Sequence, residues 1–439
     1  MRLQTFPRYE LFDPLVPVHQ ITDGKRPTIH RFFDSCPISP SGRYIALNEF
    51  PYQDRPPAPG DRSFVVVVDL ASGEEVYRDS TAAWDTQVGA QVQWGATDAA
   101  LLFNRMDEAT WLPHGVQVDF TNGTERRFEA PVYHVSRDGR FAISPDLVKI
   151  GIAQAGYGVH VPPGRVAPNS GAPADDGIFI TDLERGESRL LVSLADVCAA
   201  IAPASDTFAP ETNAVYGFHT KWNDQGTRIM FIVRQFPAGA RKGKSRNWLV
   251  TLDADGSNIR VAVPPHVWSD GHHPNWEPNG DRIIMNLPPA SSAGLFGRMR
   301  ILLGKIGRRT GLPIGRAGVP LHFRSVRFDG ADLRSVSRHQ GSGHPTIHPG
   351  GGHLMTDCYA YEPMAANDGT VPLRLIDLAT DAVRNAVRID TAPAYKGPRS
   401  EYRIDPHPAW DAQGHLLTFN GAVNGVRSVF VADFSALLQ

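Results

Sequence analysis

The stretch HPAWDAQGHLLTFN (407–420) contains a unit that recurs along the chain, and HPNWEPNGDRIIMN (273–286) repeats it closely. Each copy has an apolar anchor, a glycine four residues later, and then an apolar strand. Asp98 replaces the glycine in the second copy. A turn glycine before an apolar strand, repeated in this way, is typical of short β-hairpins. Seven anchors follow the pattern: Ile38, Trp94, Val135, Trp222, Trp276, Ile347 and Trp410.

A second motif follows within the repeats, in which an apolar strand ends in aspartate and a turn. Examples are FVVVVDLASGEE (64–75), GIFITDLERGES (177–188) and WLVTLDADGSN (248–258). Alternating strands and turns, without long helical periodicity, predict an all-β protein of the seven-bladed β-propeller class. We expect one propeller domain over residues 1–439.

The two ends of the chain predict how the ring closes. The last repeat ends at SVFVADFSALLQ (428–439), which leaves no room for a fourth strand. Within the N-terminal segment 1–34, PVHQIT (17–22) is a candidate for that strand, and we expect it to complete the last blade. This pairing would remove exposed strand edges. Two insertions, 150–176 and 288–320, are expected as loops over one face.

Composition excludes several classes of function. The chain is 41% hydrophobic and 21% charged, with a net charge of −2, so no basic field attracts nucleic acid or anionic lipid. Its three cysteines, Cys36, Cys198 and Cys358, are too far apart for a disulfide framework or a cysteine-rich zinc site. The sequence shows neither a signal-peptide core nor an apolar run near ~18 residues. We therefore expect a soluble cytoplasmic protein; the sequence does not indicate its oligomeric state.

One column of the repeat is rich in histidine. The residues three positions before the anchors are Ser35, Gln91, Val132, His219, His273, His344 and His407. In a propeller the four histidines of blades four to seven would converge on one axis, which predicts a metal site on one side of it. Ser35, Gln91 and Val132 would leave the opposite side open for substrate. The alternative is a structural histidine inherited with the repeat, bonded to a neighbouring backbone group.

Other side chains near the column complete the candidate site. Asp405 lies two residues before His407, so on a strand the two share a face, and Arg403 extends it. Asp357 is a candidate to support His344 from behind. Four further histidines are weaker candidates: His272 should point away, His348 and His353 should be solvated at a turn, and His339 precedes blade six.

The repeats, the histidine column and the segment YRIDPHP (402–408) resemble the oligogalacturonate lyase family of polysaccharide lyases, over most of the chain. The resemblance implies a seven-bladed propeller that binds manganese through histidines and a glutamine. It also implies β-elimination of short galacturonates in the cytoplasm. The family places Gln, His and His at a spacing of three and then two residues in the last blade. Here Tyr402, Asp405 and His407 occupy that spacing, so only one ligand matches.

The resemblance also implies roles for individual residues. His344 falls at the family's other metal histidine, His273 at its base, and Arg234 at its active-site arginine. We therefore expect His344, His407 and Asp405 to hold a divalent metal, with manganese first and zinc, calcium or another ion open. His273 would be the base, with His219 as a reserve base or further ligand. Arg234 and Arg403 would bind carboxylates, and Tyr402 and Gln91 would also contact substrate.

The function predicted from these residues is a metal-dependent lyase. It would cleave an acidic, uronate-containing oligosaccharide and leave a 4,5-unsaturated uronate. The metal or an arginine would neutralise the carboxylate, and a histidine would take the C5 proton. Two alternatives stay open: another metal-dependent propeller enzyme, such as a glycoside or lactone hydrolase, and a non-catalytic propeller that binds a glycan or a protein.

Overall fold

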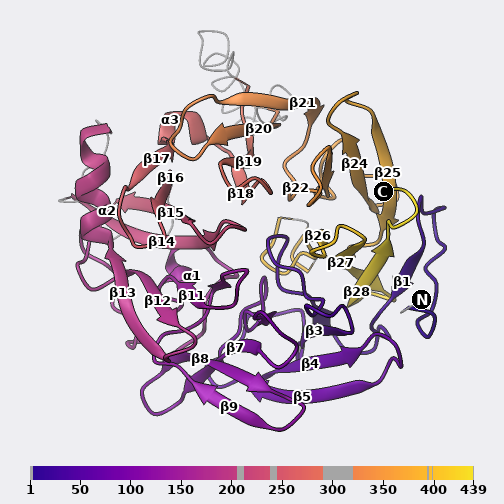
Figure 1. Ribbon diagram of the computed structural model, residues 1–439, viewed down its shortest axis with the longest axis horizontal. Coiled ribbons are helices and arrows are strands. Elements are labelled where there is room, and N and C mark those ends of the chain that lie inside the picture. The colour runs from indigo at the N-terminus through magenta and orange to yellow at the C-terminus, as the bar shows by residue number, and fades with distance from the viewer. Residues whose placement is uncertain are drawn as a thin grey trace.

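The computed structural model describes residues 3–204, 212–237, 245–289, 320–392, 395–397 and 399–438. In these residues the strands form seven four-stranded antiparallel sheets arranged in a ring (Figure 1). This confirms the predicted seven-bladed propeller. No described helix is long and apolar enough to cross a membrane.

The blades follow chain order, each running from the inner strand outward. Blades one to three are β2 (Thr28–Ile29), β3 (Tyr44–Glu49), β4 (Ser63–Asp69), β5 (Glu75–Thr81); β6 (Gln93–Trp94), β7 (Leu101–Asp107), β8 (Leu112–Asp119), β9 (Thr124–Arg127); and β10 (His134–Val135), β11 (Phe141–Ser144), β12 (Gly177–Asp182), β13 (Glu187–Ser193).

Blades four to six are β14 (Asn213–Trp222), β15 (Arg228–Pro237), β16 (Arg246–Asp253), β17 (Arg260–Val263); β18 (His272–Trp276), β19 (Arg282–Leu287), β20 (His322–Arg327), β21 (Arg334–Gln340); and β22 (Thr346–Ile347), β23 (His353–Thr356), β24 (Val371–Asp377), β25 (Val383–Ile389). Within the described part of the chain, three short α-helices interrupt the strands: α1 (Ile150–Ala153), α2 (Leu194–Ile201) and α3 (Pro265–Trp268).

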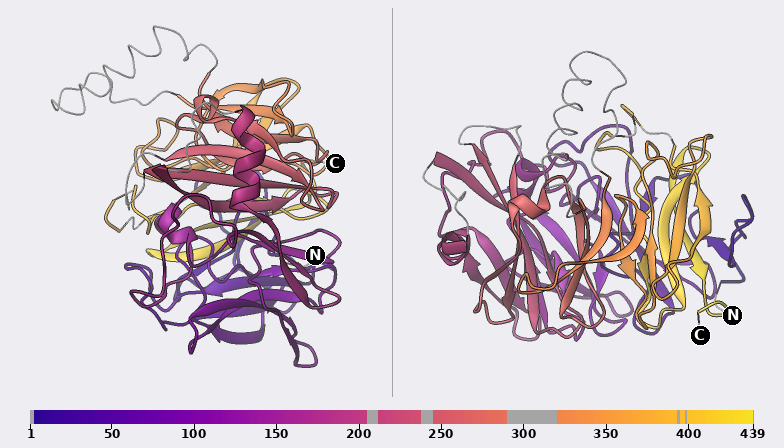
Figure 2. Two further views of the ribbon diagram at one scale, coloured as in Figure 1. Left: turned by 90° about the vertical axis from the view of Figure 1, so that its left-hand side faces the viewer. Right: turned by 90° about the horizontal axis from the view of Figure 1, so that it is seen from above.

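The ring closes through the N-terminal strand. Blade seven contains β26 (Ala409–Trp410), β27 (Leu416–Val423) and β28 (Val426–Asp433), and β1 (Val18–Gln20) pairs antiparallel with β28 as its fourth strand. Val18 lies opposite Ala432 in this pairing. The two chain ends therefore lie on the same side of the ring (Figure 2). The predicted closure is confirmed, and it covers an edge of β28 that would otherwise be open to another strand.

The repeated glycine has a common conformation. Gly42, Gly139, Gly226, Gly280, Gly351 and Gly414 all have φ between 65° and 77°. This left-handed backbone is unfavourable for residues with a Cβ, so glycine is the residue suited to the turn that follows each inner strand. The turn starts the second strand of each blade, whose buried apolar side chains pack between neighbouring sheets.

Several pairs of neighbouring blades are joined by a hydrogen bond to a polar side chain. This side chain lies on the second strand of one blade or just beyond it. In each case it accepts a hydrogen bond from a backbone N–H beside the next blade's inner strand, ahead of that strand in three blades and directly after β2 in the case of His30. The three bonds ahead of a strand fix the backbone at or next to the histidine column. They run from Ala90 to Asn48 (3.1 Å), Val132 to Asn104 (2.7 Å), His407 to Asp357 (3.2 Å) and His30 to Asn420 (3.0 Å).

Of the two predicted insertions, the first, 150–176, is described over its whole length. In 150–176, α1 packs against β14, and Tyr157 is buried beside Phe218 and His219. This part of the insertion therefore lies against the column residue His219. Most of the other insertion, residues 290–319, lies outside the described residues.

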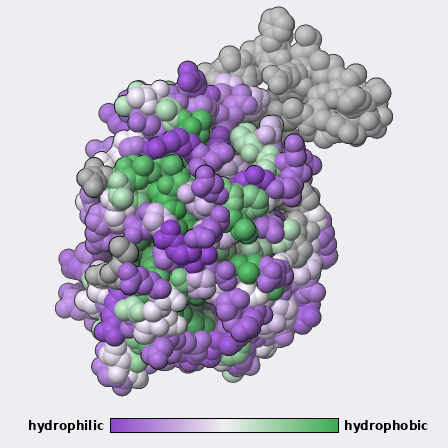
Figure 3. Space-filling model, turned by 90° about the vertical axis from the view of Figure 1, so that its right-hand side faces the viewer, coloured by the Kyte–Doolittle hydropathy of each residue, from purple (hydrophilic) through white to green (hydrophobic). Residues whose placement is uncertain are grey.

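The N-terminal segment before β1 packs on the last two blades. The Leu15 N–H donates to Ala386 O of β25, and the Arg388 guanidinium lies 4.4 Å from the centre of the Phe12 ring. Leu11 and Phe12 nevertheless remain exposed. The side of the molecule that carries the chain ends has apolar patches separated by hydrophilic residues (Figure 3).

Candidate metal centre

The histidine column occupies an irregular position in the inner strands. His273, His407 and Gln91 have φ of 54°, 49° and 61°, a region that residues with a Cβ rarely adopt. The pairing register also shifts in this part of blades four and five. Such bulges redirect side chains relative to the regular alternation of a strand. The recurring irregularity thus accompanies the turning of these side chains towards the channel.

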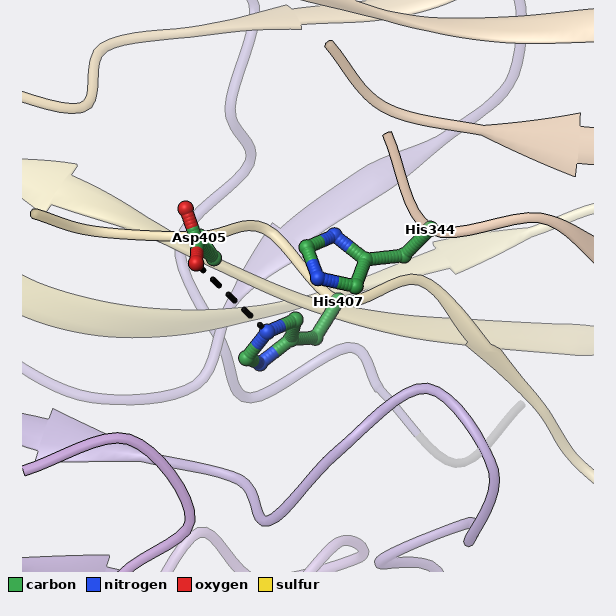
Figure 4. Close-up of side chains that lie close together, drawn as sticks. All are labelled: His344, Asp405 and His407. Atoms are coloured by element: carbon green, nitrogen blue, oxygen red, sulfur yellow. Dashed lines mark ion pairs between the residues drawn. The ribbon is translucent and has the colours of Figure 1, made fainter. Parts of the chain in front are cut away.

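Three of the four column histidines lie together. The ring centres of His273 and His344 are 3.9 Å apart, and those of His344 and His407 are 4.3 Å apart. His344 and His407 are each only 1% exposed. Asp405 approaches from the segment before β26, and the side chains of His344, His407 and Asp405 point towards one another (Figure 4). The structure thus brings together the three residues predicted as ligands.

The donor atoms of this group fit a metal ion. One ligand atom from each of His344, Asp405 and His407 lies within 4.8 Å of the others. Among the described residues, His344 Nε2 and both ring nitrogens of His407 are buried without a hydrogen-bond partner, while Asp405 Oδ2 is ion-paired with Arg403 Nη2 at 2.9 Å. Buried polar atoms without partners are rare and require an explanation. A cation held by two imidazoles and a carboxylate would satisfy His344 Nε2 and one ring nitrogen of His407, and this donor set suits zinc, iron or manganese.

Asp357 supports the group from behind. Its carboxylate lies 2.9 Å from His344 Nδ1, and it also accepts the His407 backbone N–H at 3.2 Å. A proton on Nδ1 directed at the carboxylate leaves Nε2 with a free lone pair, which is the form that binds a metal. One side chain therefore fixes the ring orientation of one candidate ligand and the backbone of another.

We predict that Asp357→Asn lowers metal affinity by about 10–100-fold, the usual effect of losing such a support. The amide cannot hold the Nδ1 proton as a carboxylate does. Calorimetric titration with Mn²⁺ measures the effect. Asp377→Asn, which changes an aspartate at the end of β24 outside the ligand group, is the matched control. Equal affinities for Asp357→Asn and the wild type would contradict this role.

Burial keeps two of the clustered imidazoles uncharged. It lowers the pKa of His273 and of His407 well below the ordinary value, and the neighbouring His344 lowers the pKa of both further. An uncharged imidazole is the form that binds a metal or accepts a proton. Burial also acts to lower the pKa of Arg403, but the adjacent Asp405 carboxylate outweighs it and the net shift is upward.

His273 differs from the ligand group in its partners. Its Nδ1 lies 3.0 Å from Gly343 O, and its Nε2 lies 3.2 Å from the Tyr359 hydroxyl. With Nδ1–H donating to the carbonyl, Nε2 is left as an acceptor. His273 is half-buried, whereas His344 and His407 are fully buried. This arrangement suits a base better than a ligand.

His219 lies apart from the other three. Its Nδ1 is hydrogen-bonded to the Tyr133 hydroxyl, and its ring is packed by Phe218, Tyr157 and Phe32. Phe32 contacts both His219 and His407, with ring centres 5.2 and 4.6 Å away. The structure therefore does not bring His219 into the ligand group.

The side of the channel expected to be open is filled. After β2 the chain leaves the sheet, and Phe32 and Phe33, at 1% and 2% exposure, pack among the histidines. Phe33 also lines a cavity of about 370 Å³ that includes Ser35 but none of the four column histidines. The loop thus forms a floor that separates the histidines from that cavity. The expectation of an open side was wrong because Phe32 and Phe33, from the loop after β2, occupy it.

The four residues predicted to bind substrate or its carboxylates lie in different surroundings. Gln91 is buried, and its Oε1 accepts from Arg31 Nε at 2.8 Å. Tyr402 is 1% exposed, and its hydroxyl lies 3.5 Å from Lys396 Nζ. Arg234 donates to Ala153 O and Gln154 in and after α1. Arg403 pairs with Asp405 and is the predicted carboxylate binder nearest the ligands.

The weaker histidine candidates lie outside the ligand group. His272 is half-buried next to His273, and burial lowers its pKa to about 4. His348 is not simply solvated as expected, because its Nε2 lies 3.0 Å from Gly414 O and its ring packs on Trp410. His353 is half-buried on β23, and His339 pairs with Asp381 on an outer strand.

Two site residues did not emerge from the sequence. Tyr359 contacts His273, and its position two residues after Asp357 was the signal that could have revealed it. His30 is fully buried with its ring centre 6.5 Å from that of His407, and burial lowers its pKa to about 4. Nothing in its sequence context matches the repeated column, so the sequence contained no signal for His30.

Comparison with known proteins supports the fold. No family model and no curated protein matches this sequence. The structure is similar to an oligogalacturonate lyase solved in complex with manganese, with a TM-score of 0.62 and 12% identity over 98% of this chain and 96% of that one. An oligogalacturonate lyase from Vibrio parahaemolyticus matches with a TM-score of 0.62 and 11% identity, over 99% of this chain and 98% of that one.

The tricorn protease is a more distant structural match, with a TM-score of 0.51 and 11% identity over 93% of this chain and 34% of that one. The fold is therefore that of a seven-bladed propeller, and the resemblance to oligogalacturonate lyases expected from the sequence extends over nearly the whole chain.

Proposed function

We propose that the protein is a metal-dependent lyase that cleaves uronate-containing oligosaccharides by β-elimination. The observation that carries this proposal is the buried group of His344, Asp405 and His407, in which ring nitrogens of both histidines lack partners, beside the half-buried His273. Similarity in fold to oligogalacturonate lyases, one of them in complex with manganese, supports the choice of reaction.

His344, His407 and Asp405 would hold the divalent cation, with manganese as the first candidate. When bound, the ion would neutralise the uronate carboxylate and stabilise the negative charge that develops beside it. Arg403, whose side chain is 22% exposed next to Asp405, would bind a carboxylate of the same oligosaccharide. Arg234, which donates to Ala153 O and Gln154, would add a further positive charge.

The proton at C5 of a uronate is weakly acidic, so its removal needs a well-placed base. His273 Nε2 would take this proton while the C4–O bond breaks with its electron pair and the C4=C5 double bond forms. The hydrogen bond from Nδ1 to Gly343 O holds the ring in orientation. The Tyr359 hydroxyl, 3.2 Å from Nε2, would supply a proton to the departing oxygen.

Incubation of the purified protein with oligogalacturonates tests the proposal. We expect growth of the ultraviolet absorbance of a 4,5-unsaturated uronate, its loss on chelation, and its return when Mn²⁺ is added. Neutral galacto-oligosaccharides are the control, because they lack the carboxylate that acidifies C5. Protein that binds metal but forms no unsaturated product from any uronate oligomer would refute the lyase assignment.

A further inference from the structure

Asp405 has two competing uses in this structure. Arg403 Nε donates to its Oδ1 at 3.0 Å, and Arg403 Nη2 lies 2.9 Å from its Oδ2. The same Oδ2 lies 3.9 Å from His407 Nε2 and belongs to the group that fits a metal. A two-pronged arginine–carboxylate pair is a strong, geometrically specific interaction. A metal ion at this site must therefore share the carboxylate with a guanidinium.

Sharing would be unfavourable in this environment. A divalent ion on Asp405 Oδ2 would lie next to a guanidinium that is already in contact with that oxygen, and like charges repel strongly in a buried site. The two partners differ in exposure, because the Asp405 side chain is 2% exposed and that of Arg403 is 22% exposed. Arg403 is thus the partner that a ligand from solvent can reach.

We infer that Arg403 couples metal binding to carboxylate binding, an inference that rests on the metal role proposed above. The carboxylate of a uronate draws the Arg403 guanidinium away from Asp405 and frees Oδ2 for the metal. The metal in turn repels the guanidinium from Asp405 and makes it available to the uronate. Such coupling is reciprocal, so each ligand tightens the binding of the other by the same factor.

The first measurement uses the intact wild-type protein. Mn²⁺ is titrated by calorimetry, and free Mn²⁺ is followed by electron paramagnetic resonance, with and without saturating D-galacturonate. We expect galacturonate to tighten Mn²⁺ binding by about 5–150-fold, the usual range for coupled sites. D-galactose, which lacks the carboxylate, should leave the affinity unchanged.

Arg403→Gln gives a result that a merely structural role would not produce. Without sugar, this variant should bind Mn²⁺ more tightly than the wild type, because Asp405 has lost its competitor. Galacturonate should no longer change that affinity. Arg403→Lys keeps the positive charge but loses the guanidinium that contacts both oxygens of Asp405, so it should retain a smaller effect of galacturonate. This variant also provides the test if Arg403→Gln does not fold. Arg388→Gln, which removes a more exposed arginine–aspartate pair on β25, should behave as the wild type.

Two outcomes would overturn the inference. One is a Mn²⁺ affinity in the wild type that galacturonate does not change. The other is an undiminished galacturonate effect in Arg403→Gln, which would mean that the sugar acts on the metal directly. Failure of the proposed metal role looks different, because the protein would then bind no Mn²⁺ with or without sugar.

Discussion

His273→Ala should lower kcat on oligogalacturonates by about 10²–10⁴-fold, the usual contribution of a positioned general base. The variant should still bind Mn²⁺ with close to wild-type affinity. The reason is the different hydrogen bonding of the histidines: Nε2 of His273 faces the Tyr359 hydroxyl, whereas His344 Nε2 and both ring nitrogens of His407 are buried without partners. Steady-state kinetics and metal titration of the same preparation measure the two effects separately.

His339→Ala is the matched control for this prediction. His339 is also a half-buried histidine, but it lies on the outer strand β21 and bonds to Asp381. The loss of His339 should change kcat by no more than a factor of a few from the wild-type value. An unchanged rate in His273→Ala would place the base elsewhere, and a parallel loss of Mn²⁺ binding would make His273 a ligand.

Asp34→Ala should lower the free energy of unfolding by about 3–5 kcal/mol, as expected when one partner of a buried ion pair is removed. Asp34 pairs with Arg31 Nη1 at 2.6 Å and with Lys221 Nζ at 3.0 Å, and all three side chains are 1% exposed. The alanine leaves two buried cations without their carboxylate. Urea unfolding of both proteins at neutral pH measures the difference.

The pH dependence of this effect has a definite sign. Burial alone would raise the pKa of Asp34, but Arg31 and Lys221 outweigh it and hold the pKa below its ordinary value. A depressed folded-state pKa adds stability that is fully present above the unfolded pKa, about 3.9, and is lost as the pH falls. The destabilisation should therefore shrink once the pH falls below about 4.

Asp224→Ala is the control for Asp34→Ala. Asp224 also pairs with an arginine, Arg137, but the two side chains are 47% and 52% exposed. Exposed pairs contribute about 0–1 kcal/mol, so this variant should unfold almost as the wild type does. Equal effects of the two substitutions would show that the loop containing Asp34 is not held by buried charge.

The candidate ligands could be predicted because they depend on the repeat. His344 and His407 stand at equivalent positions of neighbouring blades, and equivalent positions in a ring face the same axis. Asp405 followed from the two-residue alternation of an extended chain. The closing strand was equally accessible, since a last repeat one strand short requires a partner from elsewhere.

The residues around those ligands could not be predicted in the same way. Phe32 and Phe33 reach the axis from a loop that leaves the repeat after β2, and no periodicity marks such a loop. The separation of His219 from His407 depends on that loop, because Phe32 contacts both rings. The repeat makes these two histidines equivalent, and only packing distinguishes them.

The sequence by itself thus determined the number of blades, the closure of the ring and the column that supplies His344 and His407. Its repeating turn glycines and apolar strands are local patterns, and local patterns specify strands and their order. The tertiary structure alone decided which histidines cluster and that the channel has an aromatic floor. These features depend on side-chain packing between segments distant in the chain, which no local pattern encodes.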